Sequence, residues 1–243
     1  MIESLYTPIG KSIVTIAAPA SAGGPRGTAR PLPPPLAAEG LERLNGELRE
    51  ASARRVVERT FERAARPIVS TSFGPDSAVL LALVRDVRAD ATVVWVDTGH
   101  HTRATRRFAE RLTAEWDLDV RVYRPRHAPE TLAARFGGVP GPDDPAHADF
   151  AEAVKLEPFR RALAELDPDC WITGIRAEET GWRRTLDVAS AGPGGLVKIA
   201  PLLHWTREDV ERFCLERGLP GAHDYHDVVK AGPKRECGLH DRL

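Results

Sequence analysis

Short apolar runs alternate with amphipathic segments through most of the chain, and this alternation restricts the fold more than any other feature. The apolar runs lie at 67–72, 92–96, 119–123, 170–174 and 196–201. Helical patterns lie between and after them, at 76–87, 102–116, 128–136, 150–166 and 207–218. Strands that alternate with helices predict βαβ units, and therefore a doubly wound α/β fold whose mostly parallel sheet is flanked by helices. An amphipathic segment from Leu41 to Phe61 predicts one earlier helix, ended by Pro67.

The composition changes near residue 38. Residues 1–38 are rich in Pro, Gly and Ala and have no hydrophobic period, so we expect a disordered N-terminal tail. Residues 39–220 are then expected to form one α/β domain, and 221–243 a C-terminal arm. A hydrophobic content of 42% in 243 residues is sufficient for a core of that size.

Charge and cysteine content restrict the partners and the compartment. The net charge of -1 provides no overall basic field, so no nucleic-acid partner is expected. Three cysteines without framework spacing favour a reducing, cytoplasmic setting. No apolar run approaches the roughly 18 residues that span a bilayer, so no membrane association is expected. Residues 12–22 weakly resemble a signal peptide, but Glu3 and Thr15 argue against secretion.

The first predicted strand is followed by SFGPDS at 72–77. Backbone N–H groups between a strand and a helix point outward with the positive end of the helix dipole, which suits an anion. The segment resembles the PP-loop of the adenine-nucleotide hydrolase-like superfamily, SGGxDS, with Phe73 in place of the first glycine. An ordinary strand-to-helix turn is the alternative. The candidate substrate-binding residues here are Ser72, Phe73, Gly74, Asp76 and Ser77.

Two further loops follow predicted strands at the same edge of the sheet. Asp97, Thr98 and Gly99 are candidates to contact a ribose or an adenine edge, although Asp97 or Thr98 could instead cap the helix that begins near Thr102. The loop at 175–184 carries Arg176, Arg183 and Arg184 beside two glutamates. Guanidinium groups bind phosphate in a fork geometry, so Arg176 and Arg183 are candidates for phosphate binding, with a salt-bridged surface loop as the alternative.

The chain ends with KRECGLH at 234–240, followed by three more residues. Lys234 and Arg235 are cations close to Cys237, and nearby cations lower a thiol pKa and favour the reactive thiolate. A solvated tail with an unused cysteine is the alternative. Cys170 lies in an apolar run and Cys214 lies between Phe213 and Leu215, so both are expected to be core residues.

Taken together, these segments resemble the sulfonucleotide reductases of the phosphoadenylyl-sulfate (PAPS) reductase family. The matching pieces occur in the order SFGPDSAV, VVWVDTG, VKLEPFRRAL, WITGIRAEETGWRR, VKIAPLLHW and KRECGLH, across roughly residues 65–240. The ECGLH ending is the most specific of them.

The resemblance implies that Cys237 attacks the sulfate sulfur of PAPS and that reduced thioredoxin, or glutaredoxin, then releases sulfite. It further implies that Arg176, Arg183, Lys234 and Arg235 hold the phosphates and the sulfate. His226 or His240 is expected to line the site entrance, and His240 to shield the site or to shuttle a proton. Relatives that use adenylyl sulfate (APS) hold a four-iron cluster with four cysteines. Three cysteines cannot do so, which makes PAPS the expected substrate and predicts no bound metal or iron–sulfur cluster.

Two departures from the family pattern keep alternatives open. TGHHTRAT at 98–105 replaces an aromatic and acidic segment, and Ala177 replaces an arginine. Both changes affect how the 3′-phosphate would be held. The alternatives are a cluster-free APS reductase, a PP-loop nucleotidyl transferase or ATP pyrophosphatase, and a non-catalytic nucleotide-binding protein. The sequence also leaves a homodimer open.

Overall fold

The computed structural model describes residues 38–221, 224–230, 236 and 238–240. Six strands form one sheet in the order β3-β2-β1-β4-β6-β5. They are β1 (Pro67–Thr71), β2 (Thr92–Val96), β3 (Asp119–Tyr123), β4 (Cys170–Ile172), β5 (Ala189–Ala191) and β6 (Val197–Ile199). All neighbours pair in parallel except β5, which runs antiparallel to β6 at the edge. The predicted doubly wound, mostly parallel sheet is confirmed, while the short strand β5 was not predicted.

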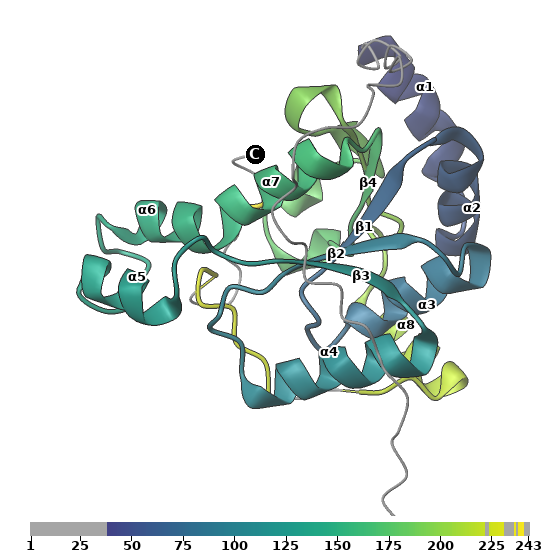
Figure 1. Cartoon of the computed structure of the whole chain (residues 1–243). Helices are drawn as coiled ribbons and strands as arrows, with labels where there is room; N and C mark the ends of the chain where they lie inside the picture. Colours follow the sequence, from purple (N-terminus) through teal and green to yellow (C-terminus); the bar gives the residue numbers. More distant parts are fainter. Residues whose placement is uncertain (1–37, 222–223, 231–235, 237, 241–243) are drawn as a thin grey trace, which may run out of the picture.

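Helices cover both faces of this sheet (Figure 1). The α-helices are α1 (Ala38–Leu48), α2 (Ala53–Arg63), α3 (Ser77–Val87), α4 (Arg103–Trp116), α5 (Pro129–Phe136), α6 (His147–Ala151), α7 (Glu157–Leu166) and α8 (Arg207–Arg217). A π-helix, η1 (Glu152–Leu156), joins α6 to α7, and three short 3-10 turns are η2 (Ala177–Glu179), η3 (Arg183–Thr185) and η4 (Pro193–Gly195). None of the helices in the described part of the chain is long and apolar enough to cross a membrane.

Successive strand residues enter opposite cores, as the two-residue period of a strand requires. Val69, Val93 and Ile172 pack against α2, α3, α4 and α8. Ile68 and Val94, one residue away in each strand, pack with α5, α6, η1 and α7 on the other face. Both faces of the central strands are therefore buried, which explains why these segments read as continuous apolar runs.

The predicted first helix is in fact two helices. The break lies at Ser52, whose Oγ accepts a hydrogen bond from the backbone N–H of Arg55 at 3.3 Å and caps the start of α2. Asn45 in α1 binds both backbone groups of Ala189 in β5 through its side chain, at 2.8 and 2.7 Å. Thus α1 packs against the sheet edge, and the continuous helical pattern concealed a turn because Ser52 was not recognised as an N-cap.

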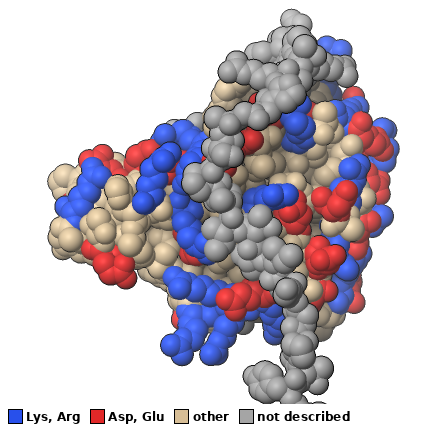
Figure 2. Space-filling view, in the orientation of Figure 1, with Lys and Arg blue, Asp and Glu red and all other residues tan. Residues whose placement is uncertain are grey.

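The sheet order reverses at β1, which has β2 on one side and β4 on the other. In open parallel sheets, a crevice forms beyond the carboxyl ends of the strands at such a reversal. The loop after β1 (72–76) and the loop after β4 (173–176) therefore face each other. On the outer surface, basic and acidic side chains are interspersed over the face shown in Figure 2, in line with the balanced net charge.

Candidate active site

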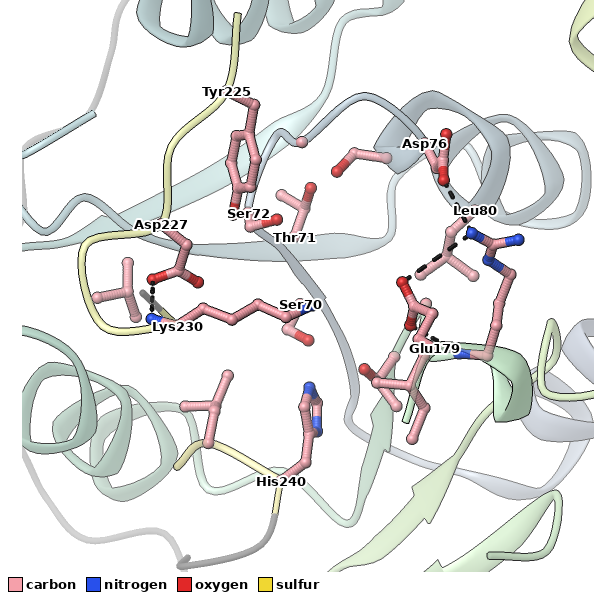
Figure 3. Close-up of a pocket in the computed structure, with 18 of the residues that line it drawn as sticks. Ser70, Thr71, Ser72, Asp76, Leu80, Glu179, Tyr225, Asp227, Lys230 and His240 are labelled. Carbon is pink, nitrogen blue, oxygen red and sulfur yellow. Dashed lines mark hydrogen bonds and ion pairs between the residues drawn. The ribbon is translucent and has the colours of Figure 1, made fainter. Parts of the chain in front are cut away.

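A cavity of about 230 Å³ opens at this reversal of the sheet. Its lining includes residues of the loop after β1, the loop after β4 and the π-helix. It also includes residues of the C-terminal segment, by which we mean the described residues from 224 to 240 (Figure 3). The predicted residues that line it are Ser72, Gly74, Asp76, Ser77, Thr98, Arg176, Arg183 and His240. The site thus lies beyond the carboxyl ends of the strands, as predicted. It brings together residues up to 168 positions apart, from Ser72 to His240.

Phe73 is the exception in the loop after β1, because its side chain points into the core. Its ring is fully buried and packs edge-to-face on Trp95, with ring centroids 5.2 Å apart, and on Phe108. Its backbone is left-handed, with φ of 48°, which is the region that glycine adopts without strain. The aromatic packing thus holds a loop shape that glycine would supply in the SGGxDS pattern.

Gly74 lies where the C-terminal segment approaches this loop. A Cβ placed on Gly74 would lie 3.5 Å from the ring of Tyr225 and 3.3 Å from Oγ of Ser72. Tyr225 itself lines the cavity. The ring of Tyr225, from near the end of the chain, therefore lies directly against the loop.

Asp76 lies at the start of α3, but its carboxylate forms no cap to that helix. Instead it accepts from Arg176 at 3.1 Å and from Arg207 at 3.0 Å. The two guanidinium groups compensate its charge at the mouth of the cavity. Arg207, the first residue of α8, was not predicted as a site residue, and its sequence context gave no signal beyond an ordinary helix start.

Of the three candidates after β2, only Thr98 lines the cavity among the described residues. The Asp97 carboxylate turns away, accepting from Arg124 at 3.0 Å and from the backbone N–H of Gly99 at 3.1 Å. Gly99 adopts a φ of 83°, and a Cβ there would lie 2.6 Å from Pro129. The alternative, in which Asp97 or Thr98 caps the next helix, is wrong, because Thr102 caps α4 by accepting from the backbone N–H of Thr105.

Arg176 and Arg183 are both buried and both paired with carboxylates. Arg176 binds Glu178 at 2.6 Å in addition to Asp76. Arg183 pairs with Glu179, and it also holds both oxygens of Glu236 at 2.9 Å. The salt bridges that the alternative predicted for this loop are therefore present, but both arginines are buried and line the cavity.

Cys237, Lys234 and Arg235 lie outside the described residues, and so does most of the predicted tail. The described residues on either side of Cys237 are nevertheless held at the site. Glu236 pairs with Arg183 and accepts from the Thr180 hydroxyl at 2.5 Å, while Leu239 is buried and lines the cavity.

His240 is half-buried and lies against the sheet. Its ring stacks on Trp171, with centroids 5.0 Å apart and planes 15° from parallel, and its carbonyl accepts from Lys198 at 3.2 Å. Nδ1 is buried without a hydrogen-bond partner among the described residues. Burial, reinforced by the positive charge of Arg183 and Lys198, holds the pKa of His240 well below its usual value. His226, the other candidate for the entrance, is exposed and does not line the cavity.

The cavity is also lined by residues that were not predicted to belong to the site: His101, Lys155, Tyr225, Asp227 and Lys230. Lys155 forms a buried ion pair with Asp227, with Nζ 2.5 Å from Oδ2. A lysine inside the apolar run that precedes Pro158 was a usable signal, because a buried cation needs a partner. Tyr225, Asp227 and Lys230 lie in an aperiodic segment that offered no signal.

The two described cysteines lack the environment of a nucleophile. Burial raises the pKa of Cys170 to about 12, and burial also raises the pKa of Cys214. Both thiols stay protonated near neutral pH. No group of three or more His, Cys, Asp or Glu side chains within the described ranges is arranged to hold a metal ion.

The fold and the loop after β1 place the chain in the PP-loop class of adenine-nucleotide proteins. A sequence model of the phosphoadenosine phosphosulfate reductase domain matches residues 66–229. The chain is 32% identical to the phosphoadenosine 5'-phosphosulfate reductase of Aliivibrio fischeri strain ES114, over 83% of this chain and 88% of that one. It is also 32% identical to the enzyme of that name from Xanthomonas axonopodis pv. citri, over 84% and 93% of the two chains.

The crystal structure of PAPS reductase from Candida auris in complex with phosphate has a similar fold. It superposes with a TM-score of 0.65 at 24% identity, covering 76% of this chain and 89% of that one. An FMN adenylyltransferase from Candida glabrata shares the fold more distantly, with a TM-score of 0.53 at 14% identity. The chain belongs to the phosphoadenosine phosphosulfate reductase family, and this membership makes it a sulfonucleotide reductase.

Proposed function

We propose that this protein reduces PAPS to sulfite and adenosine 3′,5′-bisphosphate, with a dithiol protein of the thioredoxin or glutaredoxin type as the electron donor. The observation that carries the proposal is the pairing of Glu236 with Arg183, because Arg183 lines the cavity and the pair holds the residue next to Cys237 beside it. The loop at 72–77 lines the same cavity. A nucleophile and an anion-binding loop would then serve one substrate.

In the first step the Cys237 thiolate attacks the sulfate sulfur. An S–S bond forms, the bond between that sulfur and the bridging oxygen breaks, and adenosine 3′,5′-bisphosphate leaves with the electron pair. In the second step one thiolate of the donor attacks the S-sulfonate. It bonds to Sγ of Cys237, the S–S bond to the sulfonate breaks, and sulfite leaves with the electron pair. The second thiolate of the donor then attacks this mixed disulfide, so the donor is oxidised to its disulfide and Cys237 returns to the thiolate.

His240 suits a role beside the bridging oxygen that leaves or the other oxygens of the sulfate, because its lowered pKa keeps the ring neutral at pH 7. A neutral imidazole donates one hydrogen bond without adding charge. The unpartnered Nδ1 is available for that contact within the described residues. Arg183 contributes indirectly here, because its guanidinium is paired with Glu236 of the C-terminal segment.

An ATP pyrophosphatase or nucleotidyl transferase remains the competing candidate, since the PP-loop fold is shared with an adenylyltransferase. The ion pairs of Asp76 favour the reductase. A carboxylate already compensated by Arg176 and Arg207 is a poor ligand for the magnesium that accompanies ATP.

Sulfite release from PAPS and from APS, with thioredoxin and a reductant, tests the proposal. Cys237→Ser should abolish sulfite release and leave PAPS binding nearly unchanged, because a hydroxyl of far higher pKa replaces the thiolate. Wild type incubated with PAPS but without donor should gain about 80 Da, the mass of one sulfonate, on Cys237. Cys214→Ser is the matched control and should retain turnover. Turnover in Cys237→Ser, or the added mass on Cys170 or Cys214, would overturn the assignment.

A further inference from the structure

We infer that Lys230 is a substrate-binding residue, whose ammonium group pairs with the phosphate–sulfate end of the sulfonucleotide. The inference rests on the proposed function and adds one residue to it. Lys230 lies in the C-terminal segment and lines the cavity. Figure 3 shows its side chain extending into the cavity below Asp227 and toward Ser70.

The charge balance of the cavity distinguishes Lys230 from its other cations. Among the described lining residues, the cations are Lys155, Arg176, Arg183 and Lys230. Three of them already have a carboxylate partner: Lys155 has Asp227, Arg176 has Asp76 and Glu178, and Arg183 has Glu179 and Glu236. The Lys230 ammonium has no ion-pair partner within the described ranges. An anionic ligand can therefore pair with Lys230 without breaking an existing ion pair.

The backbone of Lys230 is fixed before any ligand binds. The Asp227 carboxylate accepts from the backbone N–H groups of Val229 at 3.1 Å and of Lys230 at 3.3 Å, which closes a tight turn. Val228 and Val229 are buried in the core that α6, η1 and α7 form. This segment is therefore anchored immediately before Lys230.

Two further contacts attach the same segment to the domain. The carbonyl of Asp224 accepts from the Thr102 hydroxyl at 2.6 Å. His147 in α6 lies with Nε2 3.1 Å from the carbonyl of Val229. A lysine carried by a backbone held at several points loses less conformational freedom on binding than one on an unattached loop. The geometry thus presents the ammonium to the cavity in advance.

The chemistry of the ligand decides which of its parts Lys230 meets. Adenine and ribose carry no charge, whereas the phosphate–sulfate group is anionic. A compact ammonium on a flexible stem pairs with such a group as a point charge. Lys230 should therefore affect the affinity for ligands that carry an anion, and leave the affinity for adenosine unchanged.

Titration of purified protein with adenosine, adenosine 5′-phosphate, APS and PAPS tests this role. Lys230→Met retains the side-chain length but removes the charge, and should weaken APS and PAPS binding by about tenfold or more while adenosine binding stays the same. Lys230→Arg should recover most of the affinity. Arg88→Met, at an exposed end of α3 outside the cavity, removes the same charge and should behave as wild type.

Steady-state kinetics and thermal melting complete the experiment. A binding role predicts a raised KM in Lys230→Met, with a melting temperature like that of wild type. If wild type binds PAPS and releases sulfite, but Lys230→Met binds PAPS equally well, the role of Lys230 is refuted while the proposed function stands. If wild type neither binds nor turns over a sulfonucleotide, the proposed function fails, and the inference fails with it. Equal losses in Lys230→Arg and Lys230→Met would also refute a charge-based role.

Discussion

At the scale of single residues, Phe73 shows how this chain departs from the pattern that it otherwise follows. A left-handed backbone costs a residue with a Cβ about 1–2 kcal/mol, and the PP-loop pattern avoids that cost with glycine. Here the buried ring, in contact with Trp95 and Phe108, offsets it. The site loop is therefore held from beneath by the core, while its polar residues face the cavity.

At this position a glycine variant should be more stable than an alanine variant, which reverses the usual order of their stabilities. Phe73→Ala loses the ring and retains the strained Cβ, so it should lower the free energy of unfolding by about 3–5 kcal/mol. Phe73→Gly loses the same ring but relieves the strain, and should be about 1 kcal/mol more stable than Phe73→Ala. Urea denaturation of both variants measures the difference. A less stable glycine variant would show that the left-handed conformation carries no strain.

At the scale of elements, the π-helix η1 and the segment 224–230 act as a pair. The wider turn of a π-helix is uncommon and is frequent at functional sites. Here it carries Lys155, whose ion pair with Asp227 attaches the segment to the domain. The attachment places Tyr225 against Gly74 and Lys230 in the cavity. The C-terminal part of the site thus depends on a contact between residues 72 positions apart.

Asp227→Asn should lower the free energy of unfolding by about 3 kcal/mol at pH 7, because it removes the charge that faces a buried lysine. Burial alone would raise the pKa of Asp227, but Lys155 and the N–H groups of Val229 and Lys230 outweigh it, so the pKa lies below its usual value. A depressed pKa stabilises the fold at pH values above the unfolded pKa of about 4, and this stabilisation is lost as the pH falls through the folded pKa.

The stability difference between wild type and Asp227→Asn should therefore stay constant above about pH 5 and shrink below about pH 4. Denaturation curves at several pH values measure it. The double variant Lys155→Met with Asp227→Leu should recover much of the loss, since an apolar pair avoids the cost of burying charge. A difference that is the same at every pH would assign the effect to packing instead of charge.

At the scale of the whole molecule, the described domain contains its own core on both faces of the sheet. The first described helix that packs on the sheet is α1, in which Leu48 is buried and Asn45 binds β5. The residues before Ala38 lie outside the described structure. Their sequence is rich in Pro, Gly and Ala and has no hydrophobic period, so nothing in it predicts a packed element.

Removing residues 1–37 should leave the rate of sulfite release within about twofold of wild type, a small change in activation free energy. Removing residues 1–50, which also removes α1, should lower the melting temperature, because it exposes the apolar surface around Leu48 and breaks the Asn45 contacts. Activity assays and thermal melting of both truncations measure these effects. A large loss of activity on removal of residues 1–37, with the melting temperature retained, would show that the tail takes part in the reaction.

The sequence alone determined the class of fold and the edge of the sheet where the site forms. Strands buried on both faces must be apolar, and parallel strands all have their carboxyl ends at one edge of the sheet. The fold class and the position of the site can therefore be predicted from local sequence patterns. The family resemblance carried by motifs such as SFGPDSAV and WITGIRAEETGWRR was likewise readable, and the match to residues 66–229 confirms it.

Only the tertiary structure decided which side chains enter the cavity and what they meet there. Asp97 pairs with Arg124, and Arg183 pairs with Glu236. Lys230 lines the cavity but belongs to a segment whose sequence has no hydrophobic period. These outcomes depend on the orientation of a side chain and on partners far away in sequence. Burying a charge is costly unless a partner meets it, so the set of ion pairs is selected by the packed fold as a whole, and no local pattern records that selection.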